Sequence, residues 1–331
     1  MQRFIAQIKR LPVQTVVTGN QALDLDSFCS SLLTAYFETL NGRQCTPLIP
    51  IDREDLRLRK DVELILTRLD INMDSLLFLD EFSTNTETPL FLVDHNLQFM
   101  QGKVTGIIDH HAPESDKTMD DNINPMVLSR CSSAMSLVLK YYNEKLDLKK
   151  LFASDPLLAP LAFAPIAIDT SNFFNMKPED ITAYQFLANF INQIPDTITF
   201  QTVRDARKDI TGLSYSDLLR KDFKQWEEIG ISTLPKRFHK LDLEELSCAM
   251  IDYKNKLGLE VLAAMACGKK GRDFAYLGPK EFDVVTACSD MELILQKEVN
   301  GVQFFSQMQT TYSRKMVAPI LRQAYAKFKQ Q

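Results

Sequence analysis

The sequence lacks an apolar segment long enough to cross a membrane. Its longest apolar stretch, Leu157 to Ile168, is interrupted by prolines and is shorter than the roughly 20 residues that a spanning helix needs. Low-complexity segments and repeats are absent too, and 45% hydrophobic with 24% charged residues over 331 positions is typical of a soluble globular protein of two domains. We therefore expect no membrane partner, and we expect a monomer.

Paired cysteines and a strong excess of basic residues are also missing. The six cysteines are scattered, with no CxxC pair, which predicts reduced thiols in a cytoplasmic protein and not a disulfide framework. A net charge of -5 argues against a general nucleic-acid binder, so we expect no nucleic-acid partner. A local basic pocket for an anionic ligand remains compatible with this charge.

The first 14 residues leave two interpretations open, because Arg3, Lys9 and Arg10 lie on a mildly amphipathic stretch. A transit peptide is one interpretation. We favour a surface helix, because Val16 and Val17 lead directly into the first predicted strand.

Two regions of different character divide the chain. In the first, short apolar segments alternate with helical patterns, which predicts an α/β domain over residues 1–193 with a mainly parallel sheet flanked by helices. Pro195 and Asp196 interrupt the helical pattern, and a smaller α+β domain is expected over residues 200–331. We expect the active site in the cleft between these domains.

Segments of the second region have patterns of both helices and strands. Leu218 to Trp226 and Met316 to Phe328 have helical spacing, whereas Leu246 to Tyr253 and Glu260 to Ala266 fit strands or helix ends. The apolar pattern of three further segments predicts strands, at Phe274 to Leu277, Val284 to Cys288 and Val302 to Gln309.

Acidic residues and histidines recur directly after apolar segments of the first region. Such residues would meet where ligands bind in open α/β sheets, outside the carboxyl ends of the strands. Converging carboxylates repel each other unless a cation neutralises them. The recurring groups are Asp24 with Asp26, Asp94 with His95, Asp109 with His110 and His111, and Asp169.

Each of these residues has an ordinary structural alternative. Asp24 and Asp26 could form an Asx turn or cap a helix, although Ser27 could do the capping and leave both carboxylates available. Asp169 could equally cap a helix. The repetition of the pattern along the sheet favours metal binding.

The remaining residues of the pattern have supporting roles in this interpretation. We expect His95 to lie behind the ligands and Asp109 to orient a histidine by accepting its ring N–H. His111 is either a core residue or a contact for substrate phosphate.

Mixed carboxylate and imidazole ligands suit Mg²⁺ or Mn²⁺, with Co²⁺ or Zn²⁺ as alternatives. In hydrolases that attack phosphorus, two such ions lie roughly 3.5–4 Å apart, and a water between them becomes the nucleophile. The sequence therefore predicts two divalent cations.

Four segments in this order resemble the motifs of the DHH phosphoesterase superfamily: GNQALDLDS (19–27), LVDHN (92–96), IIDHH (107–111) and AIDTSNF (167–173). The chain resembles the exopolyphosphatase branch of that superfamily beyond these motifs, and its C-terminal part is similar to a DHHA2 domain. The segments that carry this second resemblance are 48–63, 207–226, 230–241 and 313–321.

The resemblance implies a ligand set. Asp24 and Asp94 would hold one metal, and Asp94 would bridge to a second metal held by the residues Asp26, His110 and Asp169. The expected catalytic residues are the bridging Asp94 together with Asp109 and His111. The related family II pyrophosphatases usually have a histidine where this chain has Asn20, so Asn20 favours an exopolyphosphatase and Mg²⁺, and it is an expected substrate contact or ligand.

Cationic residues in the matched C-terminal segments are expected to bind substrate phosphates. Lys224 and the pair Arg314 and Lys315 resemble the phosphate-binding residues of the related pyrophosphatases, and such groups stabilise charge on a transferring phosphoryl group. For Lys208, a solvated surface charge is nearly as good an interpretation.

Two basic features stay open. The run of Arg53, Arg57, Arg59 and Lys60 is either a solvated helix start or a track for a polyphosphate chain. Arg130 departs from the family pattern and either adds a phosphate contact or points away.

The leading hypothesis is hydrolysis of the terminal phosphate of inorganic polyphosphate by an exopolyphosphatase. A pyrophosphatase, or a phosphatase for tri- and tetraphosphates, is the alternative within the same chemistry. A non-enzymatic metal-binding protein would have lost a core acid, and none is missing. A nuclease or cyclic-dinucleotide phosphodiesterase would carry a glycine-rich GGGH-like motif, which this sequence lacks.

Overall fold

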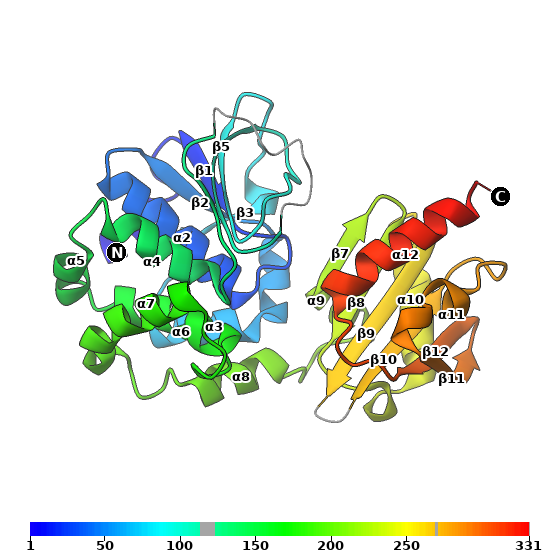
Figure 1. Cartoon of the computed structure of the whole chain (residues 1–331). Helices are drawn as coiled ribbons and strands as arrows, with labels where there is room; N and C mark the ends of the chain where they lie inside the picture. The colour runs from blue at the N-terminus through cyan, green and yellow to red at the C-terminus, as the bar shows by residue number, and fades with distance from the viewer. Residues whose placement is uncertain (113–122, 269–270, 331) are drawn as a thin grey trace. The chain divides into compact units, whose positions relative to one another are not determined.

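The computed structural model describes residues 1–112, 123–268 and 271–330. The chain forms two compact units, Met1–Asp209 and Ile210–Gln331, which are described separately (Figure 1).

The first unit is built around a parallel sheet of six strands in the order β3-β2-β1-β4-β5-β6. Its strands are β1 (Thr15–Thr18), β2 (Cys45–Ile49), β3 (Leu77–Phe78), β4 (Pro89–Val93), β5 (Lys103–Asp109) and β6 (Met126–Leu128). Its helices are α1 (Gln2–Ile5), α2 (Leu25–Leu40), α3 (Lys60–Arg68), α4 (Ala134–Asn143), α5 (Leu148–Ser154), α6 (Leu158–Asp169), α7 (Pro178–Leu187) and α8 (Phe200–Lys208). This architecture confirms the predicted α/β fold.

The strand order contains a point where the direction of winding reverses. The chain passes from β1 to β2 on one side of β1, and β4 pairs with β1 on the other side. The loops after β1 and β4 therefore diverge at the same edge of the sheet, which is where open α/β folds bind ligands. This reversal places the segments after Thr18 and Val93 next to each other.

Helix α6 forms the centre of the helical layer. Its sequence, LAPLAFAPIAID, is apolar on nearly all sides, and it packs against α2, α4, α7 and α8. A helix that is hydrophobic all round is stable only when it is buried, and nine of its twelve residues are buried. The core thus fixes the position of the last residue of α6, Asp169.

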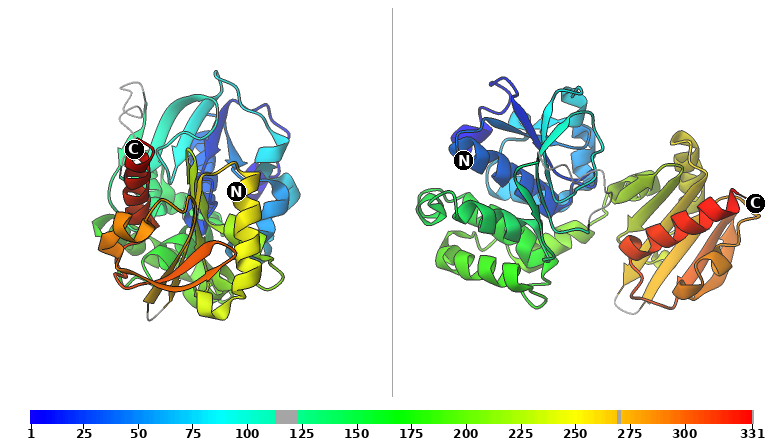
Figure 2. Two further views of the ribbon diagram at one scale, coloured as in Figure 1. Left: turned by 90° about the vertical axis from the view of Figure 1, so that its right-hand side faces the viewer. Right: turned by 45° about the horizontal axis from the view of Figure 1, so that its top comes forward.

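The second unit is a mixed six-stranded sheet in the order β11-β12-β10-β9-β8-β7, with helices on both faces (Figure 2). Its strands are β7 (Phe223–Trp226), β8 (Ile229–Leu234), β9 (Val261–Gly268), β10 (Gly271–Leu277), β11 (Leu293–Val299) and β12 (Val302–Gln307). Its helices are α9 (Tyr215–Lys221), α10 (Leu243–Lys256), α11 (Val284–Ala287) and α12 (Arg314–Phe328). Among the described residues of this unit only β8 and β9 pair in parallel, so the unit is α+β, as predicted.

Alternation along β9 explains the two helical layers of this unit. Ala263 and Met265 belong to the same apolar cluster as Val317 and Leu321 of α12. Leu262 and Ala264 belong to the opposite cluster, with Leu246 of α10. Successive side chains of a strand point to opposite faces, so a continuously apolar strand needs cover on both.

Several predicted elements of the second unit are wrong. A strand is predicted over residues 284–288, but residues 284–287 form helix α11, because Asp283 caps Val285 and Thr286. Helix α9 ends at Lys221, and residues 223–226 form β7 instead of continuing the predicted helix. Residues 246–253 lie inside helix α10.

No single helix in the described ranges combines the length and apolar character that crossing a membrane requires; α5 and α6 meet that test only when counted together, across a bend of 108°.

Candidate metal centre

The loop between β1 and α2 supplies the first group of polar side chains. It passes close to α2, since a Cβ at Gly19 would lie 2.0 Å from Ser27 Oγ. Ser27 Oγ accepts a hydrogen bond from the backbone N–H of Asn20 (2.6 Å). Asp24 is the N-cap of α2, where its Oδ1 accepts from the N–H of Ser27 (3.0 Å). Of the two capping alternatives, the structure thus has Asp24 and not Ser27, and one oxygen of Asp24 is engaged.

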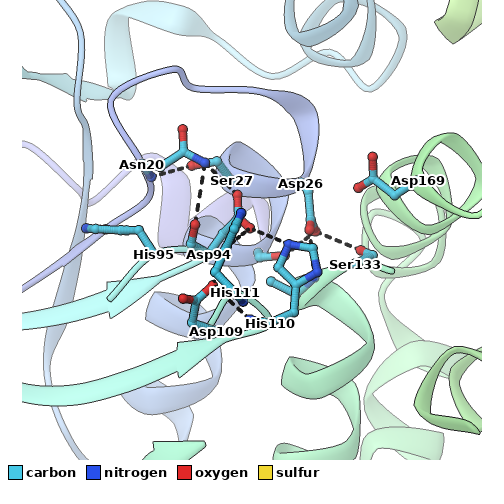
Figure 3. Close-up of polar contacts among 12 residues, drawn as sticks. Asn20, Asp26, Ser27, Asp94, His95, Asp109, His110, His111, Ser133 and Asp169 are labelled. Carbon is cyan, nitrogen blue, oxygen red and sulfur yellow. Dashed lines mark hydrogen bonds and ion pairs between the residues drawn. The ribbon is translucent and has the colours of Figure 1, made fainter. Parts of the chain in front are cut away.

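Asp26, in the first turn of α2, contacts the start of α4, 108 residues further along the chain. Its carboxylate accepts from the backbone N–H groups of Ala134 (2.6 Å) and Met135 (3.1 Å) and from the hydroxyls of Ser30 and Ser133. The positive end of a helix favours a negative charge. Asp26 thus holds α4 while it faces the other acidic residues (Figure 3).

Asp94 follows β4 in a backbone conformation that is uncommon for a residue with a side chain, with φ at +63°. Its carboxylate is only 2% exposed, and its Oδ2 accepts from Asn20 Nδ2 (2.7 Å). Its Oδ1 lies 3.1 Å from His110 Nε2. Burial raises the pKa of Asp94 well above its usual range, and the nearby Asp24 and Asp26 raise it further.

His110 is oriented by a backbone carbonyl. Its Nδ1 lies 2.9 Å from the oxygen of Cys131, and a carbonyl can only accept, so Nδ1 carries the proton and donates it. Nε2 is therefore the nitrogen available to a cation, and it points at Asp94. Burial lowers the pKa of His110, but its hydrogen bonds with Asp94 and Cys131 and the charges of Asp94 and Asp26 raise it to about 12.

Asp109 and His111 form a second pair. Asp109 is fully buried at the end of β5, and its Oδ1 lies 2.7 Å from His111 Nδ1. Asn96 Nδ2 donates to the other oxygen of Asp109 at 2.6 Å. Burial alone would raise the pKa of Asp109, but its hydrogen bonds and the two imidazole charges hold it at about 2. This arrangement leaves Nε2 of His111 for another contact.

His95 differs from the other two histidines of the group. Its Nδ1 lies 3.0 Å from the carbonyl of Val93, and its ring lies 5.3 Å from that of Phe99. The ring extends away from His110 in Figure 3. His95 is buried behind the acidic group.

Asp169 ends α6, where the negative end of the helix disfavours a carboxylate. Burial raises the pKa of Asp169 well above its usual range, Asp26 adds to this, and Arg207, whose Nη1 lies 3.8 Å away, opposes it. Three left-handed residues, Ser171 to Phe173, follow directly. A carboxylate whose charge is disfavoured by burial and by its own helix end, and is only partly balanced by Arg207, fits a residue that binds a cation.

The donor set fits a divalent metal ion. Asp94, Asp109, His110 and His111 each offer a ligand atom, and these four atoms lie within 4.8 Å of one another. Because Asp109 already accepts from His111, Asn96 and two backbone N–H groups, it is better suited to orienting the histidines than to binding metal. The charges of Asp24 and Asp26 raise the pKa of Asp94, and the charge of His110 lowers that of Asp169, so these three carboxylates interact electrostatically with the group.

The predicted cations of the C-terminal segments lie in different surroundings. In the second unit, the guanidinium of Arg314 contacts both the carboxylate and the carbonyl of Asp222, each at 2.7 Å. This contact brings the start of α12 to the segment that carries Lys224. Lys315 is exposed beside Arg314. Lys208 is exposed at the end of α8 and belongs to the first unit, whereas the other three cations belong to the second.

Two members of the basic run, Arg53 and Lys60, are engaged in contacts within the first unit. Arg53 donates to Glu81 and to the carbonyls of Met73 and Leu76, and its guanidinium lies 4.4 Å from the centre of the Phe78 ring. Lys60 pairs with Asp209 at 2.9 Å. Arg59 is buried and Arg57 is exposed. Arg130, the other open basic residue, is exposed.

Sequence logic missed the residues that hold the ligands in place. Asn96, Ser133, Asp180 and the carbonyl of Cys131 act through hydrogen bonds between distant segments. Of these, only Asn96 had a visible signal, because it ends the segment LVDHN.

Two family models match most of the chain. The family model "DHH family, N-terminal domain" matches residues 14–164, and the model "DHHA2 domain" matches residues 201–324. A Schizosaccharomyces pombe protein named "Putative exopolyphosphatase" is 33% identical over 248 residues, which cover 68% of this chain and 63% of that protein. The chain thus spans less than two thirds of the length of this relative.

Two further proteins are similar over nearly the whole chain. "Exopolyphosphatase PRUNE1" of Mus musculus is 24% identical over 95% of this chain and 76% of its own length. The crystal structure of a Methanococcus jannaschii protein titled "putative family II inorganic pyrophosphatase" has a TM-score of 0.63 at 22% identity, covering 94% of this chain and 99% of that one. At this identity the structure shows a shared fold. Since the two family models together account for most of the sequence, the chain belongs to the DHH family and carries a DHHA2 domain in its C-terminal part.

Proposed function

We propose that this protein is a metal-dependent exopolyphosphatase, a hydrolase that releases the terminal phosphate of inorganic polyphosphate. The names of the S. pombe and M. musculus relatives support this substrate. The observation that carries the proposal is the orientation of His110. Its Nδ1 is bound to a carbonyl, and its Nε2 is aimed at a buried carboxylate that Asn20 holds from the other side.

We propose that Asp24 and Asp94 hold one divalent ion and that Asp26, Asp94, His110 and Asp169 hold a second. When bound, such ions supply positive charge to the phosphoryl oxygens and lower the pKa of a water molecule. Mg²⁺ and Mn²⁺ match the mainly carboxylate donor set, with Co²⁺ and Zn²⁺ as alternatives.

The protein's own residues supply orientation and charge in this proposal. Asp109 holds His111 so that its Nε2 can donate a hydrogen bond or a proton to a substrate phosphate. Asn20 orients Asp94 through its amide. Lys224, Arg314 and Lys315 bind the phosphates of the substrate, as cationic groups do in phosphoryl transfer. Lys208 is the weakest member of this set.

A pyrophosphatase, or a phosphatase for tri- and tetraphosphate, is the second candidate, since it would use the same centre. The position of Asn20 favours the first candidate. Its Nδ2 donates to Asp94, and its Oδ1 accepts from the N–H of Ala22 (2.9 Å), so it acts as a hydrogen-bonding residue where a pyrophosphatase would carry a metal-binding histidine.

The test is a phosphate-release assay with Mg²⁺ on pyrophosphate, triphosphate and long-chain polyphosphate, side by side at equal concentrations of terminal phosphate. We expect release from triphosphate and from the long chain. Release from pyrophosphate alone would sink the proposal and leave the pyrophosphatase.

Two isosteric variants test the metal ligands. Asp94→Asn and Asp169→Asn should each lower turnover by more than about 100-fold, which exceeds the usual loss from an outer hydrogen-bond partner. Asn also tolerates the left-handed backbone of position 94, so the fold should persist. Asp196→Asn, at an exposed position, is the matched control. Near-normal turnover in either ligand variant refutes the proposed ligand set.

A further inference from the structure

One short segment holds two of the proposed metal ligands at once. Ser133 Oγ and the N–H groups of Ala134 and Met135 bind the carboxylate of Asp26. The carbonyl of Cys131, two residues earlier, accepts from His110 Nδ1. Within this segment the two ligands have separate partners: residues 133–135 hold Asp26, and the carbonyl of Cys131 holds His110.

The peptide group between Cys131 and Ser132 has partners on both of its ends. Its oxygen accepts from His110 Nδ1 at 2.9 Å, and its N–H donates to the carboxylate of Asp180 at 3.0 and 3.2 Å. A peptide group is planar and rigid, so fixing its N–H also fixes the direction of its C=O. Asp180 and His110 are thus joined through a single planar unit.

Asp180 is well suited to hold this peptide in place. Its carboxylate is fully buried, although it belongs to α7, 48 residues further along the chain. It also accepts from the backbone N–H of Lys177 (2.9 Å) and from Ser136 Oγ (2.8 Å). These contacts keep the side chain in one orientation.

We propose that Asp180 is a positioning residue of the metal centre, acting on His110 through the Cys131–Ser132 peptide. This inference rests on the metal centre of the proposed function. Metal-binding histidines commonly donate their second ring N–H to a carboxylate or a carbonyl, which fixes the ring and raises its basicity. Here a carboxylate and a carbonyl act in series, and an anion at the N–H end strengthens the carbonyl as an acceptor, since hydrogen bonds in a chain polarise one another.

Asp180 also caps the start of α7, so a purely structural role is the competing explanation. The two explanations predict different effects of an Asp180 variant on metal affinity when His110 is absent. A capping residue contributes to stability whatever occupies position 110. A positioning residue that acts through His110 has little effect on metal binding once the imidazole is gone.

The experiment measures Mn²⁺ affinity of the full chain by isothermal titration calorimetry, with thermal unfolding as the check on folding. Asp180→Asn keeps the shape and removes the charge, and we expect an affinity about 10- to 100-fold lower than wild type. Ser136→Ala removes another hydrogen bond to the same carboxylate and leaves the peptide contact intact. This matched control should change the affinity by no more than about threefold.

A double-mutant cycle separates the two explanations. In a His110→Ala background, Asp180→Asn should lower the remaining Mn²⁺ affinity by no more than about twofold. An equal loss in both backgrounds, or an unchanged affinity in Asp180→Asn alone, overturns the inference. If Asp180→Asn does not fold, Asp180→Glu replaces it in the same cycle, because its added methylene displaces the carboxylate from the N–H of Ser132. Its expected loss is about 3- to 10-fold, again only with His110 present.

Because the experiment measures Mn²⁺ affinity and not hydrolysis, it tests this inference separately from the proposed function. A wild-type chain that binds Mn²⁺ and hydrolyses no polyphosphate refutes the function, and the Asp180 variants still decide the inference. A wild-type chain that binds no Mn²⁺ overturns both.

Discussion

The amide of Asn20 donates a 2.7 Å hydrogen bond to Oδ2 of Asp94, and this contact joins the loops after β1 and β4. Both side chains are buried, at 6% and 2% exposure. The contact lies where the winding of the sheet reverses, so it connects the topology of the fold to the chemistry of the centre. Asp94, the carboxylate proposed to bind both metal ions, is therefore held by an uncharged hydrogen-bond donor.

Asn20→Asp should therefore destabilise the metal-free protein by about 1–3 kcal/mol, because a hydrogen bond becomes a contact between two carboxyl groups. The pKa of such a pair is raised, so the loss should deepen as the pH rises from 5 to 8. Mn²⁺ should restore most of the stability. Thermal unfolding with and without Mn²⁺ measures both effects, with the exposed Asn143→Asp as control. Equal melting temperatures of Asn20→Asp and wild type without metal would contradict the geometry.

Metal binding should release protons. Without a cation, the hydrogen bonds with Asp94 and Cys131 and the charges of Asp94 and Asp26 outweigh burial and raise the pKa of His110 to about 12, so His110 holds its second proton at pH 7. Burial, with a smaller effect from neighbouring carboxylates, also raises the pKa values of Asp94 and Asp169 well above their usual range. Ligand atoms must lose their protons to bind a metal, so affinity should increase with pH. Calorimetry of Mn²⁺ binding in buffers of different ionisation enthalpy should give about one proton or more per ion. An enthalpy that is independent of the buffer would exclude this.

Asp109→Asn should disturb the orientation of His111 while leaving all the proposed metal ligands in place. The pKa of Asp109 falls from 3.8 to about 2 on folding, which corresponds to about 2 kcal/mol of stability at pH 7. A lowered pKa stabilises above the unfolded value, so the difference between variant and wild type should shrink as the pH falls from about 4 towards 2. Urea unfolding between pH 7 and pH 2.5 measures this difference, with Asp196→Asn as control. Turnover should fall by about 10- to 100-fold. A difference in stability that does not depend on pH would argue against an ionised Asp109.

The two neighbouring cations of α12 should behave differently. Lys315 is exposed, so Lys315→Ala should raise KM for polyphosphate and leave the melting temperature unchanged. Arg314→Ala also removes two contacts with Asp222, so it should lower stability by about 1–3 kcal/mol in addition. Lys327→Ala, an exposed charge at the other end of the helix, is the control. If neither variant changes KM or kcat/KM, these residues do not bind substrate.

The first unit was more predictable than the second because its signals are local. Apolar segments such as Pro89–Val93 and the polar residues directly after them identify both the parallel strands and the edge where ligands bind. In the second unit, short elements depend on capping and pairing. Residues 284–288 have strand-like side chains, yet the cap from Asp283 makes residues 284–287 helical. The segment Leu293–Val299 is an exposed edge strand whose alternation is weak, and the sequence did not reveal it.

The limits of the two family domains, at residues 193 and 200, stay a prediction. The interruption at Pro195 and Asp196 is real in the structure, where 3₁₀ turns end at Gln193. Helix α8 nevertheless packs against α3 and α6 within the first unit. A local break in helical pattern cannot show which core a following helix joins, because that depends on packing between distant segments.

The hydrogen bonds that hold the ligands could not be predicted from the sequence for the same reason. Asp26 caps a helix 108 residues away, and the Cys131 carbonyl that orients His110 has no side-chain signal at all. Sequence pattern indicates which residue types converge on the centre. The backbone groups that orient them follow only from the folded chain.

Arg53 provides a test of whether the basic run binds polyphosphate. Its guanidinium donates to Glu81 and to two carbonyls and covers the ring of Phe78, so its charge is already engaged within the first unit. Arg53→Ala should therefore lower the free energy of unfolding by about 1–3 kcal/mol and leave KM for long-chain polyphosphate unchanged. Urea unfolding and steady-state kinetics give the two readouts, with Arg10→Ala as an exposed basic control. The opposite result, a raised KM with unchanged stability, would mean that substrate draws Arg53 out of this network and that the run is a track for the chain.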